Sequence, residues 1–315
     1  MLQATYDRAT KLGQVIYVVT EKSHADHVQN QLPGLDTDNL IIEPGRRGTA
    51  HCITMALDYV ARRHDHNEPI AFIHADHHIR DVEGFIRSFE IAANVSKKNK
   101  EIVLIGVEPT YPSTGLGYIE RDGIVEGTAG VYKVESFKEK PDFKIARKYL
   151  ASGRYLWNCG YFVGSVNIFL NEIKHSAPNL DEAYRNLSNH ELGSKEYDRT
   201  YLALGNEVID IALIEKTRSL AVVSAQFDWM DIGSFKDLHD AVELDEMQNY
   251  FRGDSIHTID VENVYIRNEE SKPIAVIGMD NVVVVNTPDG IVVARKDISH
   301  RIGEIAKEIQ AQDKK

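Results

Sequence analysis

IAFIHADHH, residues 70–78, joins a run of four apolar residues directly to a polar turn. A short continuous apolar run of this kind is typical of a strand that is buried on both faces of a sheet. Similar runs occur at residues 15–19, 40–42 and 102–105, and segments with helical periodicity separate them. This alternation predicts an α/β domain in which helices cover both faces of a parallel sheet.

The composition argues against several classes of protein, namely those that bind nucleic acid or membranes and those built on disulfides. The 315 residues include 48 Asp and Glu against 36 Lys and Arg, which gives a formal net charge of −12. This acidic balance argues against nucleic acid or an anionic membrane as a partner, because both require clustered basic residues. Two cysteines, Cys52 and Cys159, are too few for a disulfide framework. Without a long apolar stretch or a signal-peptide layout, the sequence predicts a cytoplasmic protein that does not bind membranes.

The length allows about two domains, and the composition changes after Gly253. Four short apolar runs separated by turn residues follow, at residues 263–266, 274–277, 282–285 and 291–294. A last helix is expected to begin at Asp297. We therefore expect a large α/β domain over residues 1–252 and a small β-rich domain with a terminal helix over residues 253–315.

Ligands of open α/β sheets bind at the carboxyl ends of the strands, which directs attention to the loops at 43–48, 74–79 and 107–117. Asp76 follows one predicted strand, and Asp231 follows another in the segment DWMDIGSF. Two such carboxylates would suit Mg²⁺ together with substrate phosphates. Alternatively, Asp76 caps the next helix, or the histidines around it bind a transition metal.

Three other segments suit a polar ligand. The turn EPGRRGTA, residues 43–50, combines two glycines with two arginines, which favours phosphate or a nucleobase. The dipeptide Glu139-Lys140 places an acceptor beside a cation, and the glycine turn at residues 112–118 allows a ligand to approach the backbone closely. The amide of Asn158 can bond hydroxyl groups. Turn or core roles explain each of these segments equally well.

Taken in order, these segments resemble the mannose-1-phosphate guanylyltransferases, specifically the single-function branch of the sugar-phosphate nucleotidylyltransferases. Six segments carry the resemblance along essentially the whole chain: ADH at 75–77, GLGYI at 115–119, FKEKPD at 137–142, WNCGYF at 157–162, DIALIEK at 210–216 and DWMDIGSF at 228–235. The resemblance implies a Rossmann-like nucleotidyltransferase domain with a mixed, mainly parallel sheet, followed by a small β-rich domain.

The implied reaction transfers GMP from GTP to mannose 1-phosphate and yields GDP-mannose and pyrophosphate. By resemblance, Asp76 and Asp231 hold Mg²⁺, and Lys140 completes the catalytic group by binding the sugar phosphate. The implied mannose 1-phosphate site comprises Gly115, Gly117, Glu139, Lys140, Asn158 and Gly160. The implied nucleotide site comprises Glu43, Arg47, Thr49 and Ala75.

Two departures from the family pattern stand out. Gly48 occupies a position where the family usually carries Asn or Asp, which affects recognition of the base. The family also opens with a strand and a G-G-x-G-T-R loop that clasps the nucleotide phosphates, and residues 1–14 contain nothing like it. We therefore expect about 30–40 residues to be missing upstream, and little turnover from the chain as given.

Other functions remain open at this stage. The chain can be a non-catalytic sugar-nucleotide-sensing or regulatory homologue that lost the phosphate loop, or a nucleotidylyltransferase for a different sugar 1-phosphate. A metal-dependent hydrolase built around residues 76–78 is a third possibility. For the β-rich tail we expect a contact in a homodimer.

Overall fold

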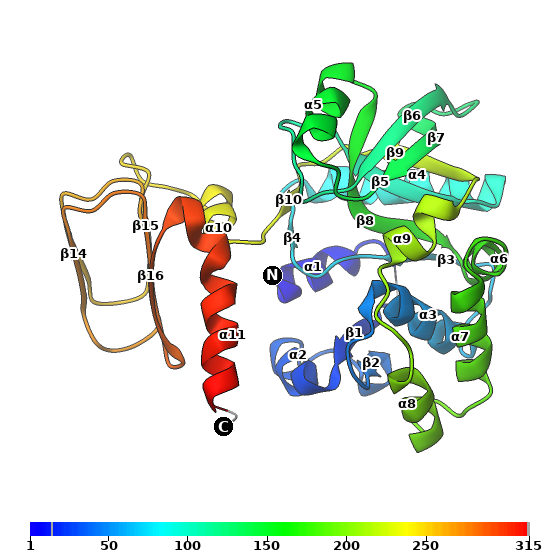
Figure 1. Ribbon diagram of the computed structural model, residues 1–315, viewed down its shortest axis with the longest axis horizontal. Coiled ribbons are helices and arrows are strands. Elements are labelled where there is room, and N and C mark those ends of the chain that lie inside the picture. The colour runs from blue at the N-terminus through cyan, green and yellow to red at the C-terminus, as the bar shows by residue number, and fades with distance from the viewer. Residues whose placement is uncertain (14, 314–315) are drawn as a thin grey trace. The chain divides into compact units, whose positions relative to one another are not determined.

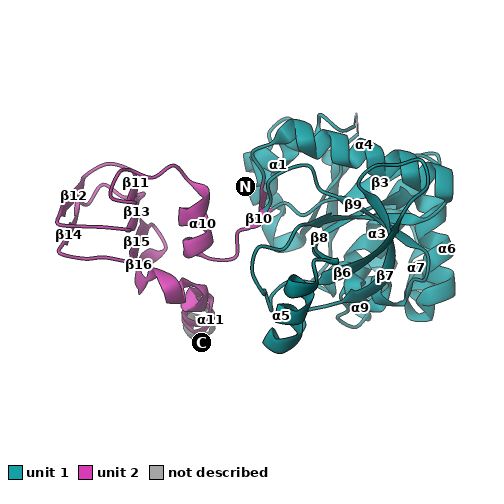
Figure 2. Cartoon of the chain, turned by 90° about the horizontal axis from the view of Figure 1, so that it is seen from above, with its two compact units in different colours: residues 1–75, 79–229 teal, residues 76–78, 230–315 magenta. Residues whose placement is uncertain are grey.

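The computed structural model describes residues 1–13 and 15–313, which form two compact units (Figures 1 and 2). The first unit comprises residues 1–75 and 79–229, and the second comprises residues 76–78 and 230–315. The predicted domain boundary at residue 252 lies within the second unit and stays a prediction. Among the described residues, no helix combines the length and apolar content needed to cross a membrane.

A six-stranded sheet with the strand order β3-β8-β5-β9-β7-β6 organises the first unit. Its strands are β3 (Pro69–Phe72), β5 (Ile102–Val107), β6 (Tyr118–Ile124), β7 (Val131–Lys138), β8 (Tyr155–Ser165) and β9 (Leu220–Ser224). Two further strands, β1 (Val18–Glu21) and β2 (Leu40–Glu43), form a separate parallel pair. Among the described residues, β1 pairs only with β2 and β3 pairs only with β8, so one edge of each strand lies outside any ladder.

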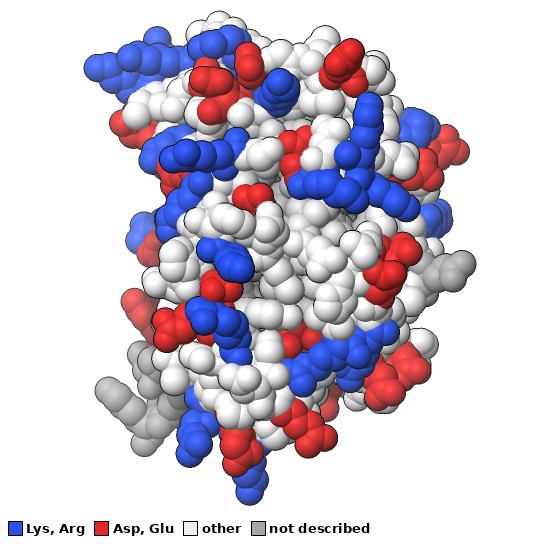
Figure 3. All heavy atoms as spheres, turned by 90° about the vertical axis from the view of Figure 1, so that its right-hand side faces the viewer, with Lys and Arg blue, Asp and Glu red and all other residues white. Residues whose placement is uncertain are grey.

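Helices surround these strands (Figure 1). They are α1 (Leu2–Ala9), α2 (Ala25–Gln31), α3 (Gly48–Ala61), α4 (Val82–Asn99), α5 (Phe143–Ser152), α6 (Val166–Ser176), α7 (Pro178–Ser188), α8 (Lys195–Leu202) and α9 (Ile209–Ala212). Short 3-10 turns occur at η1 (Lys22–His24), η2 (Thr37–Asn39) and η3 (Ile214–Lys216). On the face of the first unit drawn in Figure 3, basic and acidic side chains are interspersed.

Strand β5 shows why the apolar runs are continuous. Ile102 and Leu104 pack into a core with α3, α6 and α7, whereas Val103 and Ile105 point into a second core with α4. All four side chains are fully buried, and burying each contributes about 1.5–3 kcal/mol. The expected α/β domain with helices on both faces of its sheet is confirmed.

The share of parallel pairing is smaller than expected. Strand β8 runs antiparallel to β3, β5 and β6, and β7 runs antiparallel to β6 and β9. Within the six-stranded sheet only the β5–β9 ladder is parallel among the described residues. The physical reason is that an apolar run looks the same in either direction, so its pattern carries no information on strand orientation.

The second unit is the β-rich part of the chain. It comprises β4 (His77–His78), β10 (Met230–Asp231), α10 (Phe235–Ala241), β11 (Tyr250–Arg252), β12 (Ile256–Ile259), β13 (Tyr265–Asn268), β14 (Ile274–Ile277), β15 (Val282–Thr287), β16 (Gly290–Arg295), η4 (Lys296–Arg301) and α11 (Ile302–Asp313). Strands β11, β13 and β15 pair in parallel, as do β12 and β14, so successive strands alternate between two sheets. The helix expected from Asp297 begins instead as the 3-10 turn η4.

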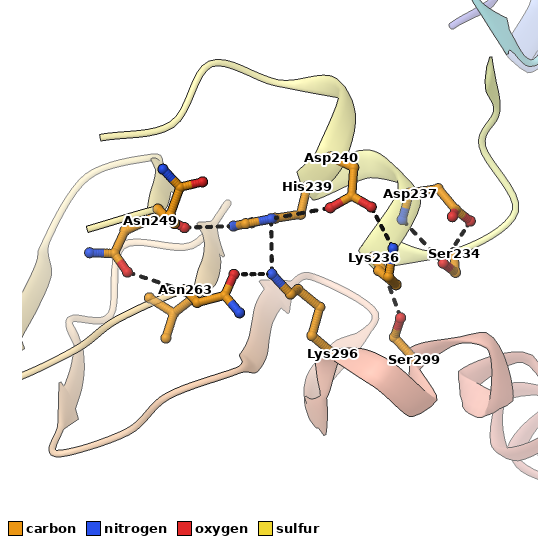
Figure 4. Close-up of polar contacts among 11 residues, drawn as sticks. Ser234, Lys236, Asp237, His239, Asp240, Asn249, Asn263, Lys296 and Ser299 are labelled. Carbon is orange, nitrogen blue, oxygen red and sulfur yellow. Dashed lines mark hydrogen bonds and ion pairs between the residues drawn. The ribbon is translucent and has the colours of Figure 1, made fainter. Parts of the chain in front are cut away.

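A buried lysine joins α10 to η4 (Figure 4). The Nζ atom of Lys296 lies 3.1 Å from Nδ1 of His239 and also donates to Oδ1 of Asn263. Because the ammonium group needs an acceptor at Nδ1, the imidazole carries its proton on Nε2, 2.9 Å from the Gln248 carbonyl oxygen. Burial, reinforced by the charge of Lys296, lowers the pKa of His239. The junction therefore holds a neutral imidazole.

Candidate functional site

The turn that leads to Asp76 is held by helix α1. The hydroxyl of Thr5 donates to the carbonyl oxygen of Ala75 over 3.0 Å, and Nη2 of Arg8 donates to the same hydroxyl over 3.0 Å. Arg8 is buried, and its guanidinium carbon lies 5.1 Å from the ring centroid of Phe85. The carbonyl of Ala75, one of the predicted nucleotide contacts, is thus already engaged within the protein.

The other side of this turn is held by Asp228. Its carboxylate accepts from the backbone N–H of Arg80 over 3.0 Å and from that of Asp81 over 2.8 Å. Asp81 in turn caps α4, because its side chain accepts from the N–H of Gly84 over 2.8 Å. The alternative role of Asp76 as a helix cap is therefore wrong. The cap lies five residues further on, which leaves the carboxylate of Asp76 available for another task.

The segments that contain Asp76 and Asp231 lie side by side in the second unit. Strands β4 and β10 pair antiparallel, with Asp231 opposite His77 and Met230 opposite His78. Asp231 thus lies across from the residue that follows Asp76, and both aspartates are exposed. Two exposed carboxylates supply hard oxygen ligands and leave room for water and phosphate oxygens, an arrangement that fits Mg²⁺.

The histidines of this segment have other surroundings. Among the described residues, no three His, Cys, Asp or Glu side chains are grouped so that they can hold a metal ion. Nε2 of His74 lies 2.5 Å from the position that a Cβ on Gly160 would take. Gly160, with φ +67°, therefore admits the imidazole ring against the backbone of β8. A transition-metal site of several histidines has no support in this geometry.

The predicted sugar residues converge around strand β8, which positions Asn158 in its middle. The N–H of Asn158 donates to the carbonyl oxygen of Gly117 over 2.9 Å. A Cβ on Gly117 would lie 2.6 Å from Oε2 of Glu139, so this carboxylate packs directly on the glycine backbone. Nζ of Lys140 lies 3.4 Å from Oε1 of Glu139. Gly115 lies on the same loop, where its N–H donates to Oγ of Ser113 over 3.2 Å.

A second carboxylate, that of Asp210, is bonded to this cluster. The sequence alone did not place it in the site. Oδ1 of Asp210 accepts from Nδ2 of Asn158 over 2.7 Å. Burial raises the pKa of Asp210. Burial is also the main cause that raises the pKa of Glu139, and the charge of Asp210 adds to it, whereas Lys140 opposes it. The cluster therefore combines two partly desolvated carboxylates with one lysine.

Three of the predicted nucleotide residues, Glu43, Arg47 and Thr49, lie in one tightly hydrogen-bonded loop, away from Ala75. Oε1 of the buried Glu43 accepts from the hydroxyl of Tyr201 over 2.6 Å and from the N–H of Arg47 over 3.1 Å. The guanidinium of Arg47 donates to the carbonyl oxygen of Leu202, with Nε at 3.1 Å. These polar groups are committed to holding the loop in place.

The same loop is fastened to the residues that precede Asp210. Oγ1 of Thr49 accepts from the N–H of Ile209 over 3.0 Å, and the N–H of Ala50 donates to the carbonyl oxygen of Glu207 over 3.1 Å. Gly48 has φ +81°, and a Cβ there would lie 2.1 Å from that carbonyl oxygen. Glycine at this position therefore has a steric reason. Residues 207–210 connect the predicted nucleotide loop to the sugar cluster.

Three further buried groups lie near these residues. Neither ring nitrogen of His51, which lies in the first turn of α3, has a hydrogen-bond partner among the described residues, and burial lowers its pKa. Burial raises the pKa of Cys52 to about 12 and also raises the pKa of Cys159 well above its usual value. Cys159 is thus a packed residue of β8 rather than a nucleophile.

Comparison with known proteins identifies the family. A family model described as nucleotidyl transferase matches residues 1–248. The chain belongs to the nucleotidyl transferase family. A second model, described as the mannoseP isomerase/GMP-like beta-helix domain, matches residues 254–309. The expected combination of a nucleotidyltransferase α/β domain with a β-rich C-terminal domain is confirmed.

Individual members of this family are similar over the whole chain. A putative mannose-1-phosphate guanylyltransferase of Vibrio cholerae is 33% identical over 100% of this chain and 68% of its own length. Mannose-1-phosphate guanylyltransferase RfbM of Salmonella typhimurium is 31% identical over 100% of this chain and 66% of its own length. The chain thus spans about two thirds of these relatives.

Among solved structures, one from Thermus thermophilus described as mannose-1-phosphate geranyltransferase superposes with a TM-score of 0.85. It is 25% identical, and the match covers 98% of this chain and 89% of the other. The resemblance to mannose-1-phosphate guanylyltransferases is confirmed at the level of the family.

Proposed function

We propose that this nucleotidyl transferase family member transfers GMP from GTP to mannose 1-phosphate, giving GDP-mannose and pyrophosphate. The observation that carries the proposal is the convergence of Gly117, Glu139, Lys140 and Asn158 on one point of the sheet. The names of relatives at 31–33% identity support the choice of sugar and base. The acceptor and donor groups of the cluster suit sugar hydroxyls, and its lysine suits a phosphate.

The chemistry asks little of the protein beyond positioning and charge stabilisation. An oxygen of the already ionised sugar phosphate forms a bond to the α-phosphorus of GTP, while the bond from that phosphorus to the bridging oxygen breaks and pyrophosphate leaves. No general base is needed. Lys140 would hold the sugar phosphate, and Glu139 and Asn158 would orient the ring.

A divalent metal is typical of this family, and we propose Mg²⁺ as the ion. Asp76 and Asp231 would hold it, and its charge would offset the negative charge that grows on the phosphates. The support for this assignment is the pairing of β4 with β10, which places Asp231 opposite His77, the residue that follows Asp76, and the exposure of both aspartates.

Pyrophosphate release from GTP and mannose 1-phosphate tests this function directly. Asp231→Asn is expected to reduce kcat by two or more orders of magnitude and to weaken Mn²⁺ binding measured by electron paramagnetic resonance. Asp289→Asn, in the turn before β16, is the matched control and should change neither quantity. Unchanged Mn²⁺ binding in Asp231→Asn would remove this residue from the metal site.

The same measurements separate the alternatives. A sensing homologue would bind GDP-mannose without releasing pyrophosphate from any substrate pair. A nucleotidylyltransferase for another sugar would release pyrophosphate with a different sugar 1-phosphate and show the same loss in Asp231→Asn.

The homodimer through the C-terminal residues stays a prediction, as does the cytoplasmic location. The support for the dimer is the exposure of large apolar side chains on β14 and β16, where Ile277 is 62%, Ile291 71% and Val293 64% exposed. Light scattering tests it. The wild-type chain should have twice the mass of the monomer, and Ile291→Glu should be monomeric.

A further inference from the structure

We propose that Asp210 is a positioning residue that fixes the side-chain amide of Asn158 and so determines which hydrogen-bonding groups the cluster offers to a sugar phosphate. This inference rests on the proposed function and adds a residue to it. Asp210 lies in the short helix α9, 52 residues along the chain from Asn158, and its side chain is 9% exposed.

Two hydrogen bonds define the orientation of the amide. Nδ2 of Asn158 donates to Oδ1 of Asp210 over 2.7 Å, and Oδ1 of Asn158 accepts from the N–H of Gly160 over 3.0 Å. An amide that is flipped by 180° would place an oxygen against the carboxylate and an NH₂ group against the N–H, and both contacts would be repulsive. The second N–H of Nδ2 is the donor that remains for a ligand.

The partners of the neighbouring carboxylate complete this pattern. Glu139, whose Oε2 packs against Gly117 on the side that also faces Asn158, can only accept hydrogen bonds when it is ionised. The cluster thus presents one amide donor and a carboxylate acceptor to the ring, beside the ammonium group of Lys140. A sugar whose hydroxyl groups match this order is bound with all of its polar groups paired, whereas an epimer leaves one buried group unpaired.

Asp210 also belongs to the segment that holds the nucleotide loop. The N–H of Ile209 donates to Thr49, and the carbonyl oxygen of Glu207 accepts from Ala50. One short stretch of chain therefore fixes both the loop assigned to the base and the amide assigned to the sugar. A displacement of this stretch would disturb both groups together.

The charge of Asp210 has a second consequence. The charged groups that act on Glu139 are Asp210 and Glu215, which raise its pKa, and Lys140, which lowers it. Glu215 is itself paired with Lys138 over 3.2 Å. Removing the charge of Asp210 lowers the pKa of Glu139, so Glu139 stays ionised to lower pH. The acid limb of sugar-phosphate binding should therefore move to lower pH.

The test compares Asp210→Asn and Asp210→Ala with the wild-type chain. Calorimetric titration with mannose 1-phosphate gives binding without turnover, and steady-state kinetics separate KM from kcat. Asp210→Ala should weaken binding about ten- to hundredfold, as expected for loss of a charge-assisted hydrogen bond, and should reduce discrimination against glucose 1-phosphate. Asp210→Asn keeps the shape and an acceptor oxygen. It should weaken binding less and shift the acid limb.

The thermal unfolding curves of both variants show whether they fold, and Asp289→Ala is the matched control. The phosphate group of mannose 1-phosphate also changes its protonation with pH. This change is the same for the wild type and for each variant, so it does not affect the difference between their pH profiles. If both variants bind and discriminate like the wild type, with an unshifted pH profile, Asp210 has no positioning role. If the wild-type chain binds mannose 1-phosphate but releases no pyrophosphate with GTP, the proposed reaction fails while the role of Asp210 is still decided by binding. If the wild-type chain does not bind mannose 1-phosphate, both proposals fail.

Discussion

The substitution Gly117→Ala would add one methyl group that contacts the predicted sugar site. A Cβ there would lie 2.6 Å from Oε2 of Glu139, 3.2 Å from Cζ of Phe137 and 3.3 Å from Cβ of Asn158. Phe137 and Asn158 belong to strands of the sheet and leave the new methyl group no free direction. Since a carbon–oxygen contact needs about 3.3 Å, the carboxylate of Glu139 must move by roughly 0.7 Å in Gly117→Ala.

A displacement of this size has a large expected effect on the ligand. Misplacing a group in a binding site by about 1 Å can cost about a hundredfold in rate. We therefore expect the affinity for mannose 1-phosphate and kcat/KM to fall about ten- to hundredfold, while KM for GTP changes little. Overpacking of the sheet should also lower the free energy of unfolding by about 1–3 kcal/mol.

Calorimetry with mannose 1-phosphate, pyrophosphate release with each substrate varied, and urea unfolding measure these quantities. Gly123→Ala is the control, because Gly123 lies in strand β6, which begins directly after Gly117, and its Cβ would have no neighbour within 4 Å. It should match the wild type in all three assays. If Gly117→Ala binds mannose 1-phosphate as tightly as the wild type, Glu139 is not a ligand of the sugar.

Two further predictions concern stability. Gly48→Ala forces a left-handed backbone onto alanine and places its Cβ against the carbonyl oxygen of Glu207. It should therefore lower the free energy of unfolding by about 2–4 kcal/mol, whereas Gly205→Ala, in open space, should be neutral; equal urea midpoints would contradict the steric argument. The pKa of His239 in the folded chain lies below its value of about 6.5 in the unfolded chain. As the pH falls, the imidazole is therefore protonated in the unfolded chain before it is protonated in the folded chain. Urea unfolding of the second unit should thus show falling stability from pH 7 to pH 5, and His239→Asn should flatten this slope; an unchanged slope would show that another group causes it.

The sequence predicted those parts of the site that depend on local order. Asp76 was placed at a strand end by the apolar run before it, and Asp231 by the run at β9. The pairing of β4 with β10, which places Asp231 opposite His77, was not visible, because strands of two residues have no periodicity. The alternative that Asp76 caps α4 was wrong, because Asp81, directly before the helix, is also an aspartate and is the residue that caps it.

Contacts between distant segments account for the rest. The guanidinium of Arg47 donates to the carbonyl oxygen of Leu202, 155 residues away. Nothing in the turn EPGRRGTA indicates such a partner. Asp210 was part of a recognised motif, but its bond to Asn158 joins two segments that only the fold brings together. The orientation of β8 also depends on such contacts, because it pairs with three strands from different parts of the sequence.

The surroundings of the two cysteines, Cys159 buried and Cys52 half-buried, have a practical consequence for spectroscopy. Burial raises the pKa of Cys52 to about 12 and raises that of Cys159 well above its usual value, so both remain protonated thiols at pH 7. Maleimide and related electrophiles react with the thiolate, which attacks them as the nucleophile, so both native thiols should react slowly in the folded chain. A cysteine introduced at an exposed position such as Asp289 can therefore carry a dye selectively. Fluorescence titrations with nucleotides or sugar phosphates then require no prior removal of native cysteines.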